Sequence, residues 1–154
     1  MFNKIKVYIV SILIPVLVGI TSALLTKGNM DIYQTINTPP FAPPAILFPI
    51  VWTILYVLMG ISSAKIILSD NPAKNNANEI YIFSLFINFF WSIIFFNLRA
   101  FTFAFVWLIL LLLSIIYTII NYYPINKKAA LMQIPYLIWV IFAGILNFSI
   151  AILN

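Results

Sequence analysis

The chain has 154 residues, of which 64% are hydrophobic and 7% carry a charge. A soluble domain of this size cannot cover so much apolar surface, so the composition predicts an integral membrane protein. The sequence contains neither cysteine nor histidine, which excludes disulfides, thiolate chemistry and the commonest metal ligand. The net charge of +5 comes from basic residues that flank apolar stretches, so we expect no binding to nucleic acid.

Five apolar stretches reach the length of about 20 residues that spans a bilayer. They predict an all-α fold, a bundle of five transmembrane helices forming one domain over residues 1–154, with spans at about 5–26, 45–68, 79–98, 101–121 and 129–152. The end of the first stretch, Thr21-Ser22-Ala23, resembles a signal-peptide cleavage site. The stretch is long for the core of a signal, which favours a retained span.

The distribution of basic residues predicts the orientation of the bundle. Lys27 and Arg99 fall on one side of a five-span chain. Six lysines fall on the other side: Lys4, Lys6, Lys65, Lys74, Lys127 and Lys128. The positive-inside rule therefore places the N-terminus in the cytoplasm and the loop 27–44 outside.

The loop before the second span contains four prolines in the six residues 39–44, which hold the backbone extended. In the span that follows, Trp52, Tyr56 and Gly60 recur at helical spacing, so one helix face carries an indole, a phenol and a gap without a side chain. Tyr33, earlier in the loop, suits either an interface anchor or the lid of a cavity. These features together predict one wall of a pocket roofed by a stiff loop.

Three other spans carry small or polar residues on one face. In the first span, Ser22 belongs to a small-residue face that suits either a neighbouring helix or a ligand. In the third span, Asn88 stands in a polar stripe beside Trp91, and its amide should point inward, toward another helix or a ligand. The fifth span places an aromatic plate, a small gap and an amide at successive steps of four residues: Trp139, Ala143 and Asn147.

The inventory of catalytic groups is short. The three carboxylates, Asp31, Asp70 and Glu79, are all predicted at loops or at a span end, so the sequence predicts no metal site and no acid/base pair. Asp31 is most simply a solvated loop carboxylate, and the alternative is recognition of a cationic ligand. The residues require no cofactor. The remaining chemistry is the stacking of tryptophans on a planar ligand.

Four groups of residues stand in the order and spacing of a known family: Tyr33 with Pro39, Pro43 and Pro44; Pro49 to Thr53 with Tyr56, Met59 and Gly60; Asn88, Trp91, Phe95, Phe96 and Arg99; and Pro135 to Leu137 with Trp139, Phe142, Ala143 and Asn147. In these positions the chain resembles the TspO/MBR family. Its members are known as tryptophan-rich sensory proteins in bacteria and as translocator protein or peripheral-type benzodiazepine receptor in mitochondria. The resemblance covers nearly the whole chain.

The resemblance implies a five-helix protein of the bacterial cell membrane, commonly a homodimer, with a cavity beneath the first loop. That cavity would bind porphyrins such as protoporphyrin IX, or aromatic drug-like molecules such as isoquinoline carboxamides. Together with the helix faces above, it leads to nine candidate ligand-binding residues: Ser22, Tyr33, Trp52, Tyr56, Asn88, Trp91, Trp139, Ala143 and Asn147. Trp52 and Trp139 are also candidate photochemical residues, because indoles are oxidisable partners for a light-excited porphyrin.

Two departures from the family pattern matter. Phe41 stands where the family often has tryptophan between its prolines, so a ring is kept and the indole N–H is lost. The animal proteins end their fifth span with a cholesterol-recognition segment that includes an aromatic residue and an arginine. Residues 148–154 of this chain contain neither tyrosine nor a basic residue, so we do not expect high-affinity cholesterol binding.

The leading functional prediction is a membrane receptor or sensor that binds porphyrin-like ligands, with light- and oxygen-dependent porphyrin degradation as an added activity. Two rivals belong to other classes. One is a transporter or exporter of tetrapyrroles or other hydrophobic ligands, and the other is a membrane scaffold switched by its ligand. The sequence does not decide the native ligand or the dimer interface.

Overall fold

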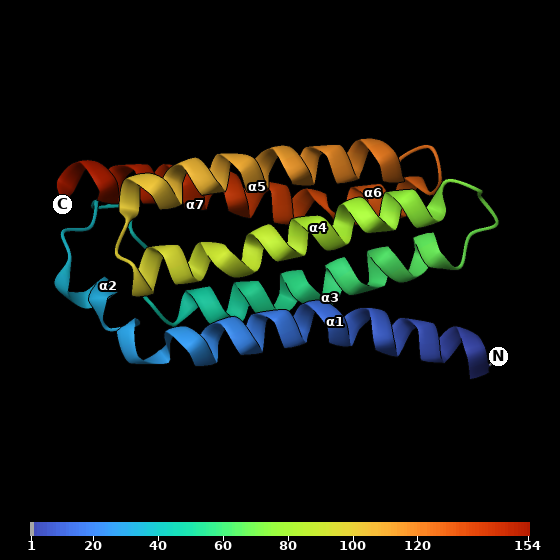
Figure 1. Cartoon of the computed structure of the whole chain (residues 1–154), viewed down its shortest axis with the longest axis horizontal. Helices are drawn as coiled ribbons and strands as arrows, with labels where there is room; N and C mark the ends of the chain where they lie inside the picture. The colour runs from blue at the N-terminus through green and yellow to red at the C-terminus, as the bar shows by residue number, and fades with distance from the viewer. Residues whose placement is uncertain (1) are drawn as a thin grey trace.

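The structure, a computed structural model, describes residues 2–154, with side chains from Asn3 onward. Five helical segments are long and apolar enough to cross a membrane, as the sequence predicts. They are α1 (Phe2–Thr26), α3 (Leu47–Ile67), α4 (Lys74–Ser92) with its π-helical extension η2 (Ile93–Asn97), α5 (Phe101–Tyr122), and α6 (Lys127–Met132) followed by α7 (Ile134–Leu153). The first loop contains the short helices η1 (Lys27–Asn29) and α2 (Ile32–Thr35) (Figure 1).

The helix boundaries differ from the predicted spans where polar residues continue a helix beyond its apolar part. The third span begins at Lys74 rather than at 79, so Glu79 lies in the second turn of α4 and not at its N-terminus as predicted. The first span begins at Phe2 rather than at 5, and the fifth begins at Lys127 rather than at 129. The proline segment 39–44, predicted to be extended, contains a turn in which the Ala42 N–H donates to the carbonyl of Pro39 at 2.9 Å. The short helices η1 and α2 precede this segment in the loop.

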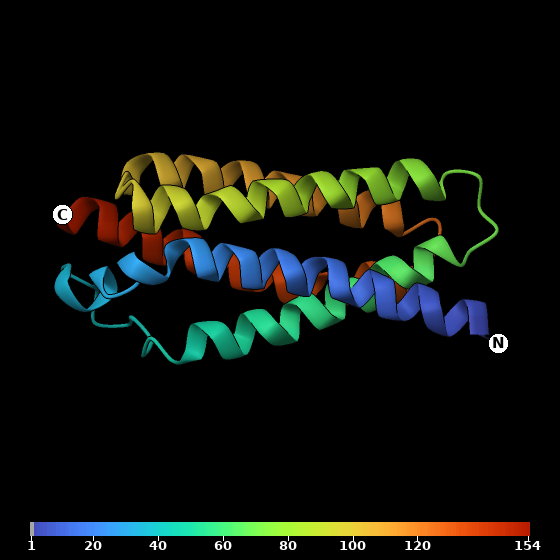
Figure 2. The same ribbon diagram turned by 60° about the horizontal axis from the view of Figure 1, so that its bottom comes forward.

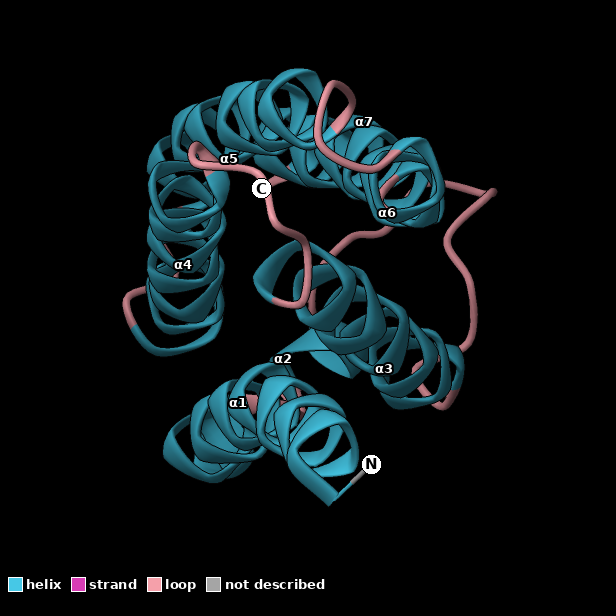
Figure 3. Cartoon of the chain, turned by 90° about the vertical axis from the view of Figure 1, so that its right-hand side faces the viewer, coloured by secondary structure: helices cyan, strands magenta, loops and turns pink. Residues whose placement is uncertain are grey.

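The helices form a ring when the bundle is viewed from its end. Contacts run from α1 to α3, from α3 to α6 and α7, from α7 to α5, from α5 to α4, and from α4 back to α1 (Figure 3). The N-terminus lies at one end of the bundle together with the α3–α4 and α5–α6 turns (Figure 1). We call this the lysine-rich end, because it carries Lys4, Lys6, Lys65, Lys74, Lys127 and Lys128. The first loop and the C-terminus lie at the opposite end (Figure 1).

Helices α1 and α3 cross each other (Figure 2), and Gly60 of α3 lies against the backbone of α1. A Cβ added to Gly60 would meet the backbone of Ile12 and would lie 2.6 Å from the carbonyl oxygen of Ser11. Pro15 lies within α1, which continues through it as one helix. Proline has no N–H, so it gives the Ser11 carbonyl no helical hydrogen bond. The two backbones can therefore approach each other closely, as small residues commonly allow in membranes.

Polar side chains inside the bundle pair with one another rather than facing lipid. The Tyr56 hydroxyl donates to Oδ1 of Asn88 at 3.1 Å, and Nδ2 of Asn88 donates to the Tyr136 hydroxyl at 2.7 Å. Nearer the lysine-rich end, Nε2 of Gln133 donates to the Ser62 hydroxyl at 3.0 Å. Buried polar groups need partners in hydrocarbon, so these bonds hold α3, α4 and α7 in register.

Candidate ligand cavity

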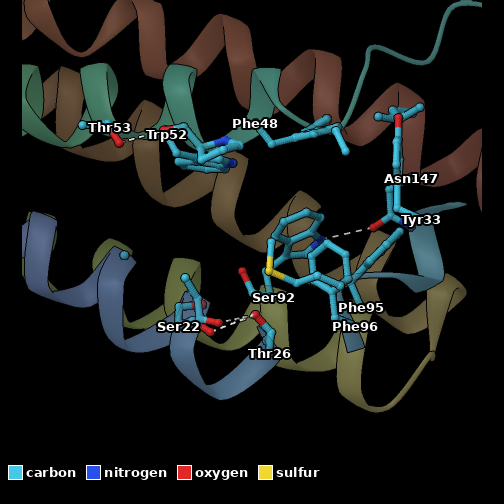
Figure 4. A pocket seen from close by; sticks show the side chains of 18 of the residues that line it. Ser22, Thr26, Tyr33, Phe48, Trp52, Thr53, Ser92, Phe95, Phe96 and Asn147 are labelled. Atoms are coloured by element: carbon cyan, nitrogen blue, oxygen red, sulfur yellow. Dashed lines mark hydrogen bonds between the residues drawn. The ribbon is translucent and has the colours of Figure 1, made fainter. Parts of the chain in front are cut away.

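A cavity of about 440 Å³ lies inside the end of the bundle that carries the first loop (Figure 4). Its walls come from α1, α3, the end of α4 with η2, and α7. Met30, Asp31 and Gln34 of the first loop also line it and are exposed, and we call this border of the cavity its mouth. Seven of the nine residues predicted from the sequence line it: Ser22, Tyr33, Trp52, Tyr56, Trp91, Ala143 and Asn147. Residues from five separate segments of the chain thus surround one space.

The aromatic wall of the cavity is built from side chains one helical turn apart. The rings of Trp52 and Tyr56 stack with their centroids 5.5 Å apart and an interplanar angle of 27°. On the other side, Nε1 of Trp91 donates to Oδ1 of Asn147 at 3.2 Å, while Nδ2 of Asn147 donates to the carbonyl of Phe101 at 2.9 Å. The Trp91 ring is therefore fixed in orientation, and it presents an aromatic surface to the cavity.

A π-helical turn brings two consecutive phenylalanines to the cavity. The N–H of Leu98 bonds to the carbonyl of Ile93 at 3.1 Å, a five-residue step that widens the helix. Phe95 and Phe96 both line the cavity, with ring centroids 5.0 Å apart. The chain then reverses at Arg99, whose φ of 52° lies in the left-handed region. The widened turn therefore places two aromatic rings against the cavity as well as packing in the bundle core.

The roof of the cavity is tied down at several points. The Tyr33 hydroxyl donates to the carbonyl of Pro43 at 3.0 Å, and the Tyr33 ring meets the Phe48 ring edge-on at 5.3 Å. Burial raises the pKa of Tyr33 above its ordinary value, which keeps the hydroxyl protonated and able to donate. Farther along, the Asn37 backbone N–H bonds to the side chain of Asn154 at 3.0 Å, which fastens the loop to the end of α7.

Two predicted site residues, Asn88 and Trp139, do not line the cavity. The Oδ1 and Nδ2 atoms of Asn88 are hydrogen-bonded to the hydroxyls of Tyr56 and Tyr136, so the amide links α4 to α3 and α7. Trp139 lies behind Phe48, with ring centroids 5.9 Å apart, and against Phe142 at 5.4 Å. Its indole N–H is buried and has no hydrogen-bond partner among the described residues.

Several lining residues were not among the predicted site residues: Thr26, Asp31, Gln34, Phe48, Thr53, Ser92, Phe95 and Phe96. Ser92 follows Asn88 by four residues in the predicted polar stripe, but only Asn88 of that stripe was chosen as a site residue. Thr53 stands one residue after Trp52, and the spacing that selected Trp52 gave no reason to extend the face to it. Asp31 was interpreted most simply as a solvated carboxylate. It is exposed, and it also lies at the cavity mouth.

The cavity offers neutral hydroxyls, aromatic faces and one carboxylate. No group of three or more His, Cys, Asp or Glu side chains that could hold a metal ion occurs in the described part of the chain. Side chains that act by stacking and by single hydrogen bonds suit the binding of a flat, mainly apolar molecule.

The fold and the cavity together define a class of integral membrane protein in which a five-helix bundle encloses an aromatic cavity under a proline-rich loop. Within this class, the chain belongs to the TspO/MBR family, whose sequence model matches residues 11–153.

Curated relatives match over most of their own length. The tryptophan-rich protein TspO of Archaeoglobus fulgidus is 36% identical over 149 residues, covering 95% of each chain. The protein of the same name from Chlorobaculum tepidum is 38% identical over 125 residues, which are 79% of this chain and 78% of the relative. The translocator protein of Bos taurus is 31% identical over 140 residues, which are 88% of this chain and 83% of the relative.

Proposed function

We propose that this protein is a membrane receptor that binds planar aromatic molecules of the porphyrin type in the cavity between α1, α3, η2 and α7. The observation that carries the proposal is the aromatic lining, in which Trp52 stacked on Tyr56 faces the space also bordered by Trp91. A volume of about 440 Å³ lies within the range of pockets that hold drug-sized ligands. The names of the relatives, which include a tryptophan-rich sensory protein and translocator proteins, agree with a receptor role.

Light- and oxygen-dependent degradation of a bound porphyrin is the second candidate function, because oxidisable indoles lie in or beside the cavity. Trp52 lines it directly, and Trp139 is separated from it by the ring of Phe48. In this proposal molecular oxygen is the oxidant. The excited ring takes one electron from an indole and passes it to oxygen, which becomes superoxide; the indole radical cation recovers an electron from the ring, and superoxide adds to the resulting ring radical cation, so that the net reaction is addition of oxygen to the porphyrin. No acid/base pair is needed, which agrees with the residues of the cavity.

The test is a titration of the purified protein in nonionic detergent with protoporphyrin IX, followed in the dark by tryptophan fluorescence. The receptor proposal predicts saturable quenching, with the affinity of Trp52→Phe reduced by no more than about tenfold because a ring remains for stacking. Trp107→Phe is the matched control, because Trp107 lies outside the cavity lining and donates to the carbonyl of Ile87 at 2.7 Å. Quenching that never saturates would overturn the receptor proposal.

The photochemical candidate has its own readout in the same samples. Illumination in air should bleach the porphyrin absorbance in the parent protein and in Trp107→Phe. Bleaching should be lost in the double variant Trp52→Phe/Trp139→Phe while dark binding persists. Unchanged bleaching kinetics in that variant would refute degradation by the indoles and leave the receptor proposal standing.

A further inference from the structure

The cavity differs in charge from the rest of the protein. The chain has eight basic and three acidic residues, yet none of the described residues that line the cavity is lysine or arginine. Among the described lining residues, Asp31 is the one that carries a charge. The nearest basic residue in sequence, Lys27, is exposed and does not line the cavity. A net positive protein therefore presents a negative charge at the entrance of its cavity.

The hydrogen-bond donors inside the cavity are neutral, and most are already used. Thr26 donates to the carbonyl of Ser22 at 2.9 Å, and Thr53 donates to the carbonyl of Pro49 at 2.7 Å. The Ser22 hydroxyl lines the cavity, is buried and has no partner among the described residues. The Ser92 hydroxyl and the Trp52 indole N–H also line the cavity, are partly exposed and form no side-chain hydrogen bond within the described chain. Neutral donors of this kind suit a neutral acceptor such as an amide or ester carbonyl. A carboxylate taken this deep would lose its hydration without gaining a cation.

A charged group on the ligand must therefore remain at the mouth, and the mouth carries Asp31. This residue lies between η1 and α2, is exposed, and borders the cavity together with Met30 and Gln34. Two unit charges about 6 Å apart in water repel or attract each other enough to change a binding constant about threefold. The carboxylate of Asp31 thus opposes an anionic substituent and favours a cationic one at the same place.

We propose that the cavity selects planar aromatic ligands whose substituents are neutral or cationic, and that Asp31 is the residue that disfavours carboxylate-bearing ligands. The inference rests on the proposed function, since it concerns the ligand of the same cavity. Among porphyrin-like rings that the cavity binds, it ranks those whose acid groups are absent, esterified or amidated above those that carry carboxylates.

The experiment compares protoporphyrin IX, which has two carboxylates, with its dimethyl ester, which has the same ring and no charge. Both are titrated in the dark against the full chain in nonionic detergent at low salt. The two porphyrins partition differently into micelles, so the readout is the ratio of their dissociation constants, Kd(acid)/Kd(ester), in each variant divided by the same ratio in the parent. The variants are Asp31→Asn, Asp31→Lys and the matched control Asp70→Asn, which removes the same charge near the lysine-rich end.

The proposal expects the ratio to fall about threefold in Asp31→Asn and about tenfold in Asp31→Lys, because the acid alone gains affinity. These changes should shrink at high salt, and Asp70→Asn should leave the ratio unchanged. An unchanged ratio in Asp31→Lys, or an equal change in Asp70→Asn, overturns the inference while the receptor proposal stands. If neither porphyrin binds saturably to the parent protein, the proposed function and the inference fall together.

Discussion

Replacement of Gly60 by alanine should destabilise the bundle at the crossing of α1 and α3. The added Cβ would meet the Cα of Ile12 and would lie 2.6 Å from the Ser11 carbonyl oxygen, whereas ordinary van der Waals contact begins near 3.4 Å, so α1 must retreat by at least about 0.8 Å. Both neighbouring atoms belong to the backbone of a long helix and cannot rotate away. Overpacking of this kind costs about 1–3 kcal/mol.

The measurement is the free energy of unfolding of the purified protein in nonionic detergent, followed by far-UV circular dichroism during a titration with sodium dodecyl sulfate. Gly144→Ala is the matched control, because nothing lies within 4 Å of a Cβ added there and alanine favours the helix by about 0.5–1 kcal/mol. Gly60→Ala should therefore be less stable than the parent, and Gly144→Ala equal or more stable. Equal stability of the two variants would refute the view that backbone contact sets this crossing.

Three further predictions concern the polar groups of the bundle. Asn88→Leu should lower the free energy of unfolding by about 1–3 kcal/mol, because the hydroxyls of Tyr56 and Tyr136 lose their shared partner; an undiminished stability would contradict this role. Tyr81→Phe should raise the free energy of unfolding by about 1 kcal/mol, because the buried Tyr81 hydroxyl has no partner in the described part of the chain, and a lower unfolding midpoint would count against this reasoning. Burial raises the pKa of Tyr33, so the roof is stabilised below the unfolded pKa of about 10 and loses this contribution as the pH rises further. Limited proteolysis of the first loop should accordingly speed up above pH 10 in the parent, with a smaller pH response in Tyr33→Phe. Equal responses in the two proteins would show that ionisation of this hydroxyl does not loosen the roof.

The five helices could be predicted from the sequence because a bilayer imposes one length on every apolar segment. Their ends could not, since the polar residues at the start of α4 continue the helix without the apolar signal. The aromatic face of α3 was predictable for a similar reason. Trp52 and Tyr56 are one helical turn apart, and this spacing alone determines that they share a side of the helix.

Other parts of the site depend on how the segments meet. Asn88 was placed inward by the sequence, but only the positions of Tyr56 and Tyr136 decide that its amide joins helices and does not line the cavity. Trp139 is likewise excluded from the lining by Phe48, which comes from a different helix. Asp31 gives no periodic signal, because it lies in an irregular turn.

The π-helical turn at Ile93–Asn97 makes one place in this membrane helix tolerant of a change in chain length. A π turn holds one more residue than an α turn, so deleting a single residue there would return the segment to α-helical geometry. Elsewhere in α4 a deletion would rotate everything beyond it by about 100°. Shortening at this turn would leave the bundle intact and remove one aromatic ring from the cavity wall. Among homologous proteins, a gain or loss of one residue at this turn would be a simple route to a differently shaped cavity in the same fold.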